Sequence, residues 1–378
     1  MNEDKATRYH RLDRQACLLS LLCNTALLAC LLASGGSGAM RDWAVAATIR
    51  TGFPSALRPA AVVGLYAAFL VLLAEIVVLP LRYYRSFVLE RRYGLSTETG
   101  GRWLKDHGKA GLIGLVFAEL GAGLVYVTLR RWPDWWWMIA AAGCAVGGIC
   151  LVRIGPVLLL PLFYRFKPLE RQALRDRLIS LAKAAGTPVL GAYEWTLGDR
   201  TRKANAALAG LGRTRRILVS DTLLAAYSDE EIEVILAHEL AHHVHRDIWT
   251  GLCYDTALTF TGFYVANRAL RVAAPALALR GLADVAGAPV LLMAGGALTL
   301  LLLPVANALS RAHERRADET ALRLTNNPGA FISAMRRLGQ QNLAEDSPSR
   351  LVTALFYTHP PVKERLRAAH DWPAAIAP

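Results

Sequence analysis

Long apolar runs constrain the fold of this chain more than any other feature of its sequence. Four of them precede residue 165, at about 16–35, 60–81, 111–129 and 135–160. Each is close to the ~20 residues that a helix needs to cross the apolar core of a bilayer. In a chain of 378 residues, a hydrophobic fraction of 54% exceeds that of ordinary soluble domains. We therefore expect a multi-pass membrane protein that is mainly α-helical.

Two further apolar runs follow a polar stretch at 165–247, which carries the helix, turn and strand signals of a soluble domain. The run at 249–266 is interrupted by Asp255, and the run at 286–309 contains Pro304 and Asn307. This gives six transmembrane spans, with seven as the alternative. The first run follows a basic start, so a cleaved signal peptide is a competing interpretation, but its length favours a retained anchor. The tryptophans at 135–137 are typical of an interfacial aromatic belt.

The basic residues of the short connections indicate an orientation. Seven Lys or Arg lie at 82–109, against three at 36–59 and three at 267–285. Because cytoplasmic connections are the positively charged ones, we expect the N-terminus, the polar domain and the C-terminal part together on the cytoplasmic side, in a bacterial inner membrane.

The net charge of +13 does not point to nucleic acid, because the Lys and Arg residues are spread over the connections and form no nucleic-acid-binding motif. Anionic lipid headgroups are the expected partner. All six cysteines lie within apolar runs and show no C-x-x-C spacing, so we expect neither cysteine ligands nor disulfides.

The sequence His238-Glu239-Leu240-Ala241-His242 contains the motif H-E-x-x-H. On a helix its two imidazoles lie one turn apart and face a single ion, while the glutamate is the general base that activates water. Ser228 and Glu231 have the spacing of a capping box, which predicts that a helix begins just before the motif. The same spacing also occurs where a histidine pair faces solvent or joins a hydrogen-bond network, so the motif needs a third ligand.

Glu314 is the candidate for that ligand, and it follows the last apolar run together with Asp318. The two carboxylates at i and i+4 alternatively form a solvated helix face beside Arg311, Arg315 and Arg316. In combination with H-E-x-x-H, Glu314 completes a His₂Glu set that leaves a position open for water or substrate, as catalytic zinc sites do. Asp318 would then orient a ligand imidazole. His243, His245 and His313 fall outside the ligand face.

Four further segments carry a family resemblance together with the two motifs described above. They are Tyr93-Gly94-Leu95-Ser96, residues 161–169, Asn205-Ala206 followed by Gly210, Arg216-Ile217 and Asp221-Thr222-Leu223-Leu224, and Thr358-His359-Pro360-Pro361 followed by Glu364-Arg365-Leu366. With the two motifs above they make six ordered segments along most of the chain. In these segments the chain resembles the zinc-type CAAX prenyl endopeptidases, integral-membrane gluzincins related to the bacterial membrane heat-shock zinc protease.

The resemblance implies one Zn²⁺ per chain and a ring of membrane helices around a large water-filled chamber, capped by the protease domain. It implies that the segment of Asn205 and Ala206 is an extended edge to which the substrate backbone adds as a strand. It also implies that His359 stabilises the oxyanion, with a turn histidine as the alternative, and that Arg365 contacts substrate. The family's histidine before the asparagine and aromatic residue after it are replaced by Lys203 and Ala207, which bears on specificity.

The predicted organisation has four parts: the N-terminal membrane region 1–164, the first part of a gluzincin-like α+β metalloprotease domain at 165–248, two further spans at 249–309, and the third-ligand helix with the rest of the protease domain at 310–378. The predicted function is zinc-dependent hydrolysis of peptide bonds in a peptide or protein substrate, lipidated or not, near the membrane. The alternative is a non-catalytic scaffold or chaperone chamber that retains a metal, and Glu239 argues against it. The residues give no indication of oligomeric state.

Overall fold

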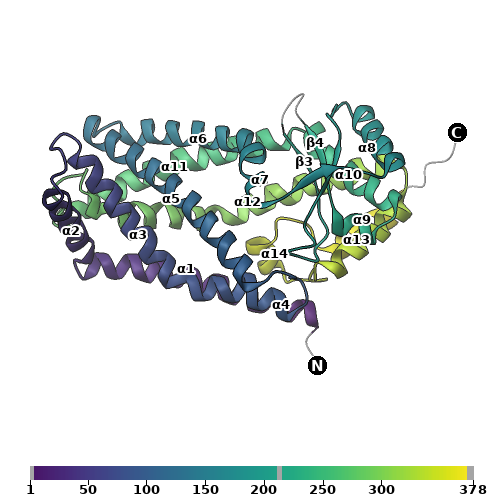
Figure 1. The fold of residues 1–378 in the computed structure, drawn as a ribbon, viewed down its shortest axis with the longest axis horizontal. Coiled ribbons are helices and arrows are strands. Elements are labelled where there is room, and N and C mark those ends of the chain that lie inside the picture. The colour runs from purple at the N-terminus through teal and green to yellow at the C-terminus, as the bar shows by residue number, and fades with distance from the viewer. Residues whose placement is uncertain (1–3, 211–214, 373–378) are drawn as a thin grey trace.

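A computed structural model describes residues 4–210 and 215–372 of the chain. The molecule is elongated (Figure 1), with a bundle of long helices at one end and a sheet with shorter helices at the other. The C-terminal helices, in yellow, lie beside the sheet, and α1 begins at the same end. This arrangement places all parts of the predicted protease domain together at one end of the bundle.

Six long helices make up the bundle, and they correspond to the six predicted spans. Within the described residues, five of them combine the length and hydropathy needed to cross a membrane. The sixth, α11, is 30 residues long and packs against α12 and α6. The bundle helices are α1 (Lys5–Ala33), α3 (Arg58–Tyr83), α5 (Gly100–Arg131), α6 (Trp136–Leu158), α11 (Asp247–Ala276) and α12 (Ala288–Thr325).

Shorter elements connect these helices. The connection between α1 and α3 contains α2 (Gly36–Arg50), whose 15 residues fall short of the ~20 needed to span a bilayer core. Helix α3 continues through the π-helix η1 (Tyr84–Leu89) into α4 (Glu90–Arg92), and the 3₁₀ turn η3 (Val285–Gly287) precedes α12.

Trp136 corrects the predicted aromatic belt. Its side chain is fully buried within the bundle, whereas the neighbouring Trp135 is 61% exposed. The indole Nε1 of Trp136 donates a hydrogen bond of 2.9 Å to Oδ1 of Asn267 on α11. A buried indole N–H needs such an acceptor, so the polar Asn267 within an apolar helix allows the ring to turn inward.

A cavity of about 590 Å³ lies between α3, α5, α6, α11 and α12. The lining of this cavity is almost wholly apolar, with side chains such as Leu70, Val125, Phe263 and Leu291.

The polar domain is built on a four-stranded sheet in the order β1-β2-β4-β3. Strands β2 and β4 are parallel, and the outer pairs β1–β2 and β3–β4 are antiparallel. Strand β3 is therefore an edge strand, and its second edge has no strand partner among residues 4–210 and 215–372. The strands are β1 (Phe166–Pro168), β2 (Ala192–Trp195), β3 (Ala206–Ala209) and β4 (Arg216–Ser220).

Helix α10 (Asp229–Val244) lies at the centre of this domain. It packs against β3, α8, α12 and α13, and Ile232, Leu236 and Leu240 are fully buried on it. Because neighbours surround it, α10 lacks the wide polar face of a surface helix. The other elements of the domain are α7 (Leu160–Phe163), α8 (Gln172–Ala184), α9 (Asp221–Ala226), α13 (Pro328–Gln341), α14 (Arg350–Phe356) and α15 (Val362–His370).

Helix α12 joins the membrane bundle to the polar domain without a break. It runs for 38 residues through Pro304 and ends at Thr325, so the predicted division at 309/310 lies inside one helix. Proline is tolerated in such helices where neighbouring segments compensate for the lost hydrogen bond. The last predicted span and the third-ligand segment are thus parts of one rod.

Candidate metal centre

The local sequence of α10 explains how two histidines come to share a face. Ser228 caps the helix by accepting a hydrogen bond from the Glu231 backbone N–H, and the Glu231 side chain accepts one from the Ser228 N–H at 2.9 Å. This reciprocal pair is the predicted capping box. The helix then places His238 and His242 one turn apart, with ring centroids 5.0 Å from each other.

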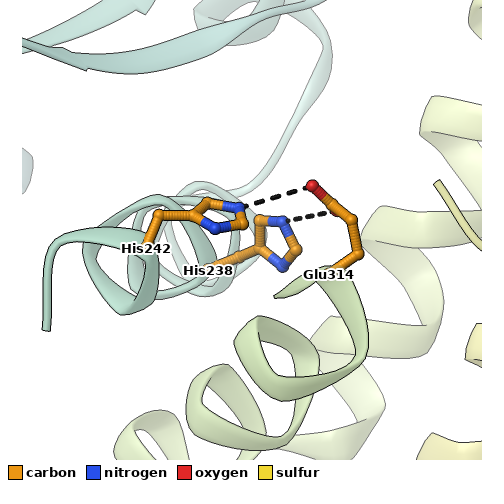
Figure 2. Close-up of side chains that lie close together, drawn as sticks. All are labelled: His238, His242 and Glu314. Atoms are coloured by element: carbon orange, nitrogen blue, oxygen red, sulfur yellow. Dashed lines mark ion pairs between the residues drawn. The ribbon is translucent and has the colours of Figure 1, made fainter. Parts of the chain in front are cut away.

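Glu314 comes from α12 and meets both imidazoles (Figure 2). Its Oε2 lies 3.1 Å from Nε2 of His238, and its Oε1 lies 3.4 Å from Nε2 of His242. Ligand atoms of the three residues all lie within 4.8 Å of one another. The structure therefore brings together the three residues that the sequence predicted as ligands.

Each imidazole also meets a second carboxylate on its other nitrogen. Nδ1 of His238 lies 2.9 Å from Oδ1 of Asp318, and Nδ1 of His242 lies 2.8 Å from Oδ2 of Asp247. Since an ionised carboxylate only accepts hydrogen bonds, each Nδ1 carries the proton. The lone pair of each Nε2 is then free for an ion. Asp318 was expected here from its spacing to Glu314, whereas sequence reasoning missed Asp247.

The electrostatics of the cluster favour a positive charge. Burial lowers the pKa of His238, but the neighbouring carboxylates of Asp318 and Glu314 outweigh it, and the pKa is raised to about 9. Glu314 Oε2 is buried and receives no hydrogen bond of acceptable geometry from the described residues. Such an atom costs free energy unless a cation satisfies it. Two imidazole nitrogens and a carboxylate oxygen fit a divalent metal ion.

Glu239 lies between the two histidines on α10 and lines a cavity of about 370 Å³. Burial is the main cause that raises the pKa of its carboxyl group, and the neighbouring histidines act in the opposite direction. His359 lines the same cavity. Its side chain is 61% exposed, and its Nε2 lies 3.3 Å from Oε1 of Glu314. Both residues that were expected to act on substrate thus border the cavity beside the three-residue cluster.

The same cavity, called the cleft below, is bordered by the start of the edge strand β3 at Asn205 and Ala206. The Asn205 carbonyl accepts a hydrogen bond of 3.0 Å from the Ser220 N–H of β4, so one edge of this segment is paired. Lys203, one of the departures from the family pattern, pairs with Glu90 at 3.0 Å. The first turns of α1 contribute His10 to the cleft, a position that no local sequence signal predicted.

Arg365 also lines the cleft, but its guanidinium is engaged by Asp318. Nε donates to Oδ2 of Asp318 at 2.8 Å, and a second guanidinium nitrogen donates to Oδ1. The structure therefore places the predicted substrate contact against the carboxylate that holds His238.

The remaining nearby histidines have other partners. His245 Nε2 lies 2.8 Å from Thr320 Oγ1, and His313 Nε2 lies 3.3 Å from Thr250 Oγ1. Neither they nor His243 belongs to the cluster formed by the described residues, in agreement with their spacing.

Comparisons with known proteins agree with this architecture. Residues 168–373 match the family model of peptidase family M48, and residues 2–165 match that of the CAAX prenyl protease N-terminal region with five membrane helices. The uncharacterized metalloprotease YhfN of Bacillus subtilis is 30% identical over 343 residues, which are 90% of this chain and 78% of that protein. CAAX prenyl protease 1 of Saccharomyces cerevisiae is 29% identical over 322 residues, 78% of this chain and 69% of that protein.

A solved structure has the same fold. The crystal structure of S. mikatae Ste24p superimposes with a TM-score of 0.82 at 24% identity, and it covers 97% of this chain and 87% of its own. Together with the two family models, which leave little of the chain unmatched, these similarities show that the chain belongs to peptidase family M48, as a membrane metalloprotease of the zinc CAAX prenyl protease family.

Proposed function

We propose that this protein is a zinc endopeptidase in which His238, His242 and Glu314 hold one Zn²⁺ per chain. The observation that carries the proposal is the convergence of two Nε2 atoms and the buried, unsatisfied Oε2 of Glu314. Three protein ligands leave one position open, as in catalytic rather than structural zinc sites. When bound, zinc supplies a Lewis acid that polarises the scissile carbonyl and lowers the pKa of a water molecule to about 7.

Glu239 is the general base in this proposal. It lines the cleft next to the ligand histidines, takes a proton from the attacking water, and gives it to the amine that leaves when the C–N bond breaks. No covalent bond to the protein forms. His359, exposed towards the same cavity, donates a hydrogen bond to the oxygen that becomes negative in the transition state.

The substrate backbone is held by strand addition to β3. The second edge of β3 has no strand partner among the described residues, and Asn205 and Ala206 border the cleft beside Glu239. An extended peptide at such an edge gains main-chain hydrogen bonds that do not depend on its sequence. Arg365 acts indirectly: it binds Asp318, which in turn positions His238 at the site that the substrate enters.

Membrane peptides and small proteins are the proposed substrates. The yeast relative is named CAAX prenyl protease 1. We therefore include proteins with a lipidated C-terminus among the candidate substrates. The apolar cavity between the bundle helices is compatible with a lipid chain, so lipidated and unmodified versions of one peptide should be compared.

We propose an inner-membrane location with the metal centre on the cytoplasmic side. The support is the charge of the connections, with seven Lys or Arg at 82–109 against three each at 36–59 and 267–285. Alkaline phosphatase fusions in the 36–59 and 267–285 connections should be active. Active fusions at 82–109 instead would reverse the orientation.

The test of the function uses the full chain, purified in detergent and reconstituted in nanodiscs. We expect one zinc per chain by inductively coupled plasma mass spectrometry. We also expect cleavage of a peptide library that stops with 1,10-phenanthroline and resumes with added Zn²⁺. Active protein without stoichiometric metal, or cleavage that is indifferent to the chelator, would refute the assignment.

A further inference from the structure

Asp247 occupies a position beside the metal centre that the proposed function does not explain. It is the first residue of α11 and only 7% exposed, although it is charged. Its Oδ2 lies 2.8 Å from Nδ1 of His242. A buried carboxylate is retained only where partners compensate for its desolvation, and Asp247 has partners on two different helices.

The turn between α10 and α11 is shaped to bring Asp247 back to His242. Arg246, just before it, has a left-handed backbone with φ 57° and ψ 35°. This conformation costs a non-glycine residue about 1–2 kcal/mol, so the surrounding structure must compensate for it. Asp247 also lies at the N-terminus of a long helix, where the helix dipole favours a negative charge.

The second oxygen of Asp247 is bound by Arg316. Arg316 lies on α12, two residues after Glu314, so the Asp247 carboxylate ties the helix that carries the histidines to the helix that carries the carboxylate ligand. The chain Arg316–Asp247–His242 has the same chemistry as the chain Arg365–Asp318–His238.

His242 needs this support more than His238 does. Its side chain is 26% exposed, against 8% for His238, so packing alone leaves its ring freer to rotate. A hydrogen bond on Nδ1 fixes both the tautomer and the direction of Nε2.

We infer that Asp247, held by Arg316, is a positioning residue of the metal centre that keeps Nε2 of His242 aimed at the ion shared with His238 and Glu314. This inference rests on the proposed zinc site. Loss of Asp247 leaves all three ligands in place but lets one of them turn, so the metal is held more weakly and in a different geometry.

The test compares Asp247→Asn with the control Glu319→Gln, an exposed residue of α12 that does not belong to the cluster. The Asn amide keeps the shape but has one acceptor oxygen instead of two and no charge, so it cannot accept hydrogen bonds from both His242 Nδ1–H and Arg316. The dissociation constant for Zn²⁺ is measured by competition with a chromophoric chelator, and the visible spectrum is recorded on the Co²⁺ form. We expect about 10–100-fold weaker zinc binding and shifted cobalt bands in Asp247→Asn, with neither change in the control.

A zinc affinity within twofold of wild type, together with an unchanged cobalt spectrum, would overturn the inference. If Asp247→Asn does not fold, Arg316→Gln replaces it, with Arg323→Gln on the same helix as control. Here we expect weaker zinc binding and shifted bands in Arg316→Gln alone, and equal values for the pair would overturn the inference. Failure of the wild type to bind zinc would instead refute the proposed function, so the two failures are distinguishable.

Discussion

Replacing Glu239 by Gln tests the catalytic assignment without disturbing the metal centre. The two side chains have nearly the same volume, so the shape of the cleft is kept and only the ability to take up a proton is lost. None of His238, His242 or Glu314 is altered, so zinc should remain at one per chain.

The structure narrows the expected fall in kcat of the Glu239→Gln variant. A positioned general base contributes about 10²–10⁴ in rate. Of the other bases that line the cleft, Glu345 accepts hydrogen bonds from Arg14 at 2.7 Å and Tyr357 at 2.6 Å, and His10 Nε2 lies 2.8 Å from the Leu343 carbonyl. His359 is assigned to the oxyanion. Because none of the three is free to replace Glu239, we expect the upper part of the range, a fall in kcat of about 10³–10⁴. This corresponds to about 4–5 kcal/mol in the barrier.

The assay measures kcat and KM on a fluorogenic peptide chosen from the library, together with zinc content. Glu233→Gln is the matched control, because Glu233 lies on the same helix but binds Arg177 outside the cleft. We expect kcat to fall in Glu239→Gln alone, with KM and zinc content unchanged. A loss of less than tenfold with zinc retained, or a loss of zinc itself, would refute the role of Glu239 as base.

Other perturbations address separate parts of the site. Glu314→Gln should leave the purified protein with well under one zinc per chain by elemental analysis, because it removes the only carboxylate of the donor set, and full occupancy would remove Glu314 from the ligands. His359→Asn should lower kcat by about 10²–10³, as loss of an oxyanion donor does, with little change in KM, and unaltered kcat would assign His359 to the turn instead. Ser228→Ala should destabilise the domain by about 1 kcal/mol, because it removes the cap of α10, and an unchanged unfolding midpoint would show that the capping box is dispensable.

His238 and His242, two of the three proposed ligands, were predictable because their signal is local. H-E-x-x-H fixes the separation of two side chains on a helix, and the capping box, present in the structure, fixes where that helix begins. Glu314 required a second motif, and the fold brings it to the first through the contact of α12 with α10.

Asp247 was not predictable in the same way. It follows His242 by only a few residues, but it lies on the next helix and reaches the imidazole through the left-handed Arg246. Left-handed turns are normally signalled by Gly or Asn, and an arginine gives no such sign. His10 was missed for another reason, because its place in the cleft depends on the packing of α1 against residues more than 300 positions away.

In the bundle, hydropathy predicted the positions of the long helices but not the burial of individual side chains. Apolar runs located the long helices well, because a bilayer requires such runs. They could not indicate that Trp136 turns inward to Asn267, since an indole is suited both to an interface and to a satisfied core position. The predicted boundary at 309/310 was based on a change from apolar to polar residues. In the structure the helix α12 continues through this point.

The unbroken course of α12 links the proposed zinc site to the membrane-spanning part of the chain. Glu314 lies about 40 Å along the rod from its start at Ala288, so a change of tilt of about 3° moves its carboxylate by about 2 Å, the length of one metal–oxygen bond. Tilt is set in part by membrane thickness. We therefore expect lipid composition to alter the geometry of the proposed zinc site and, through it, the activity of the enzyme.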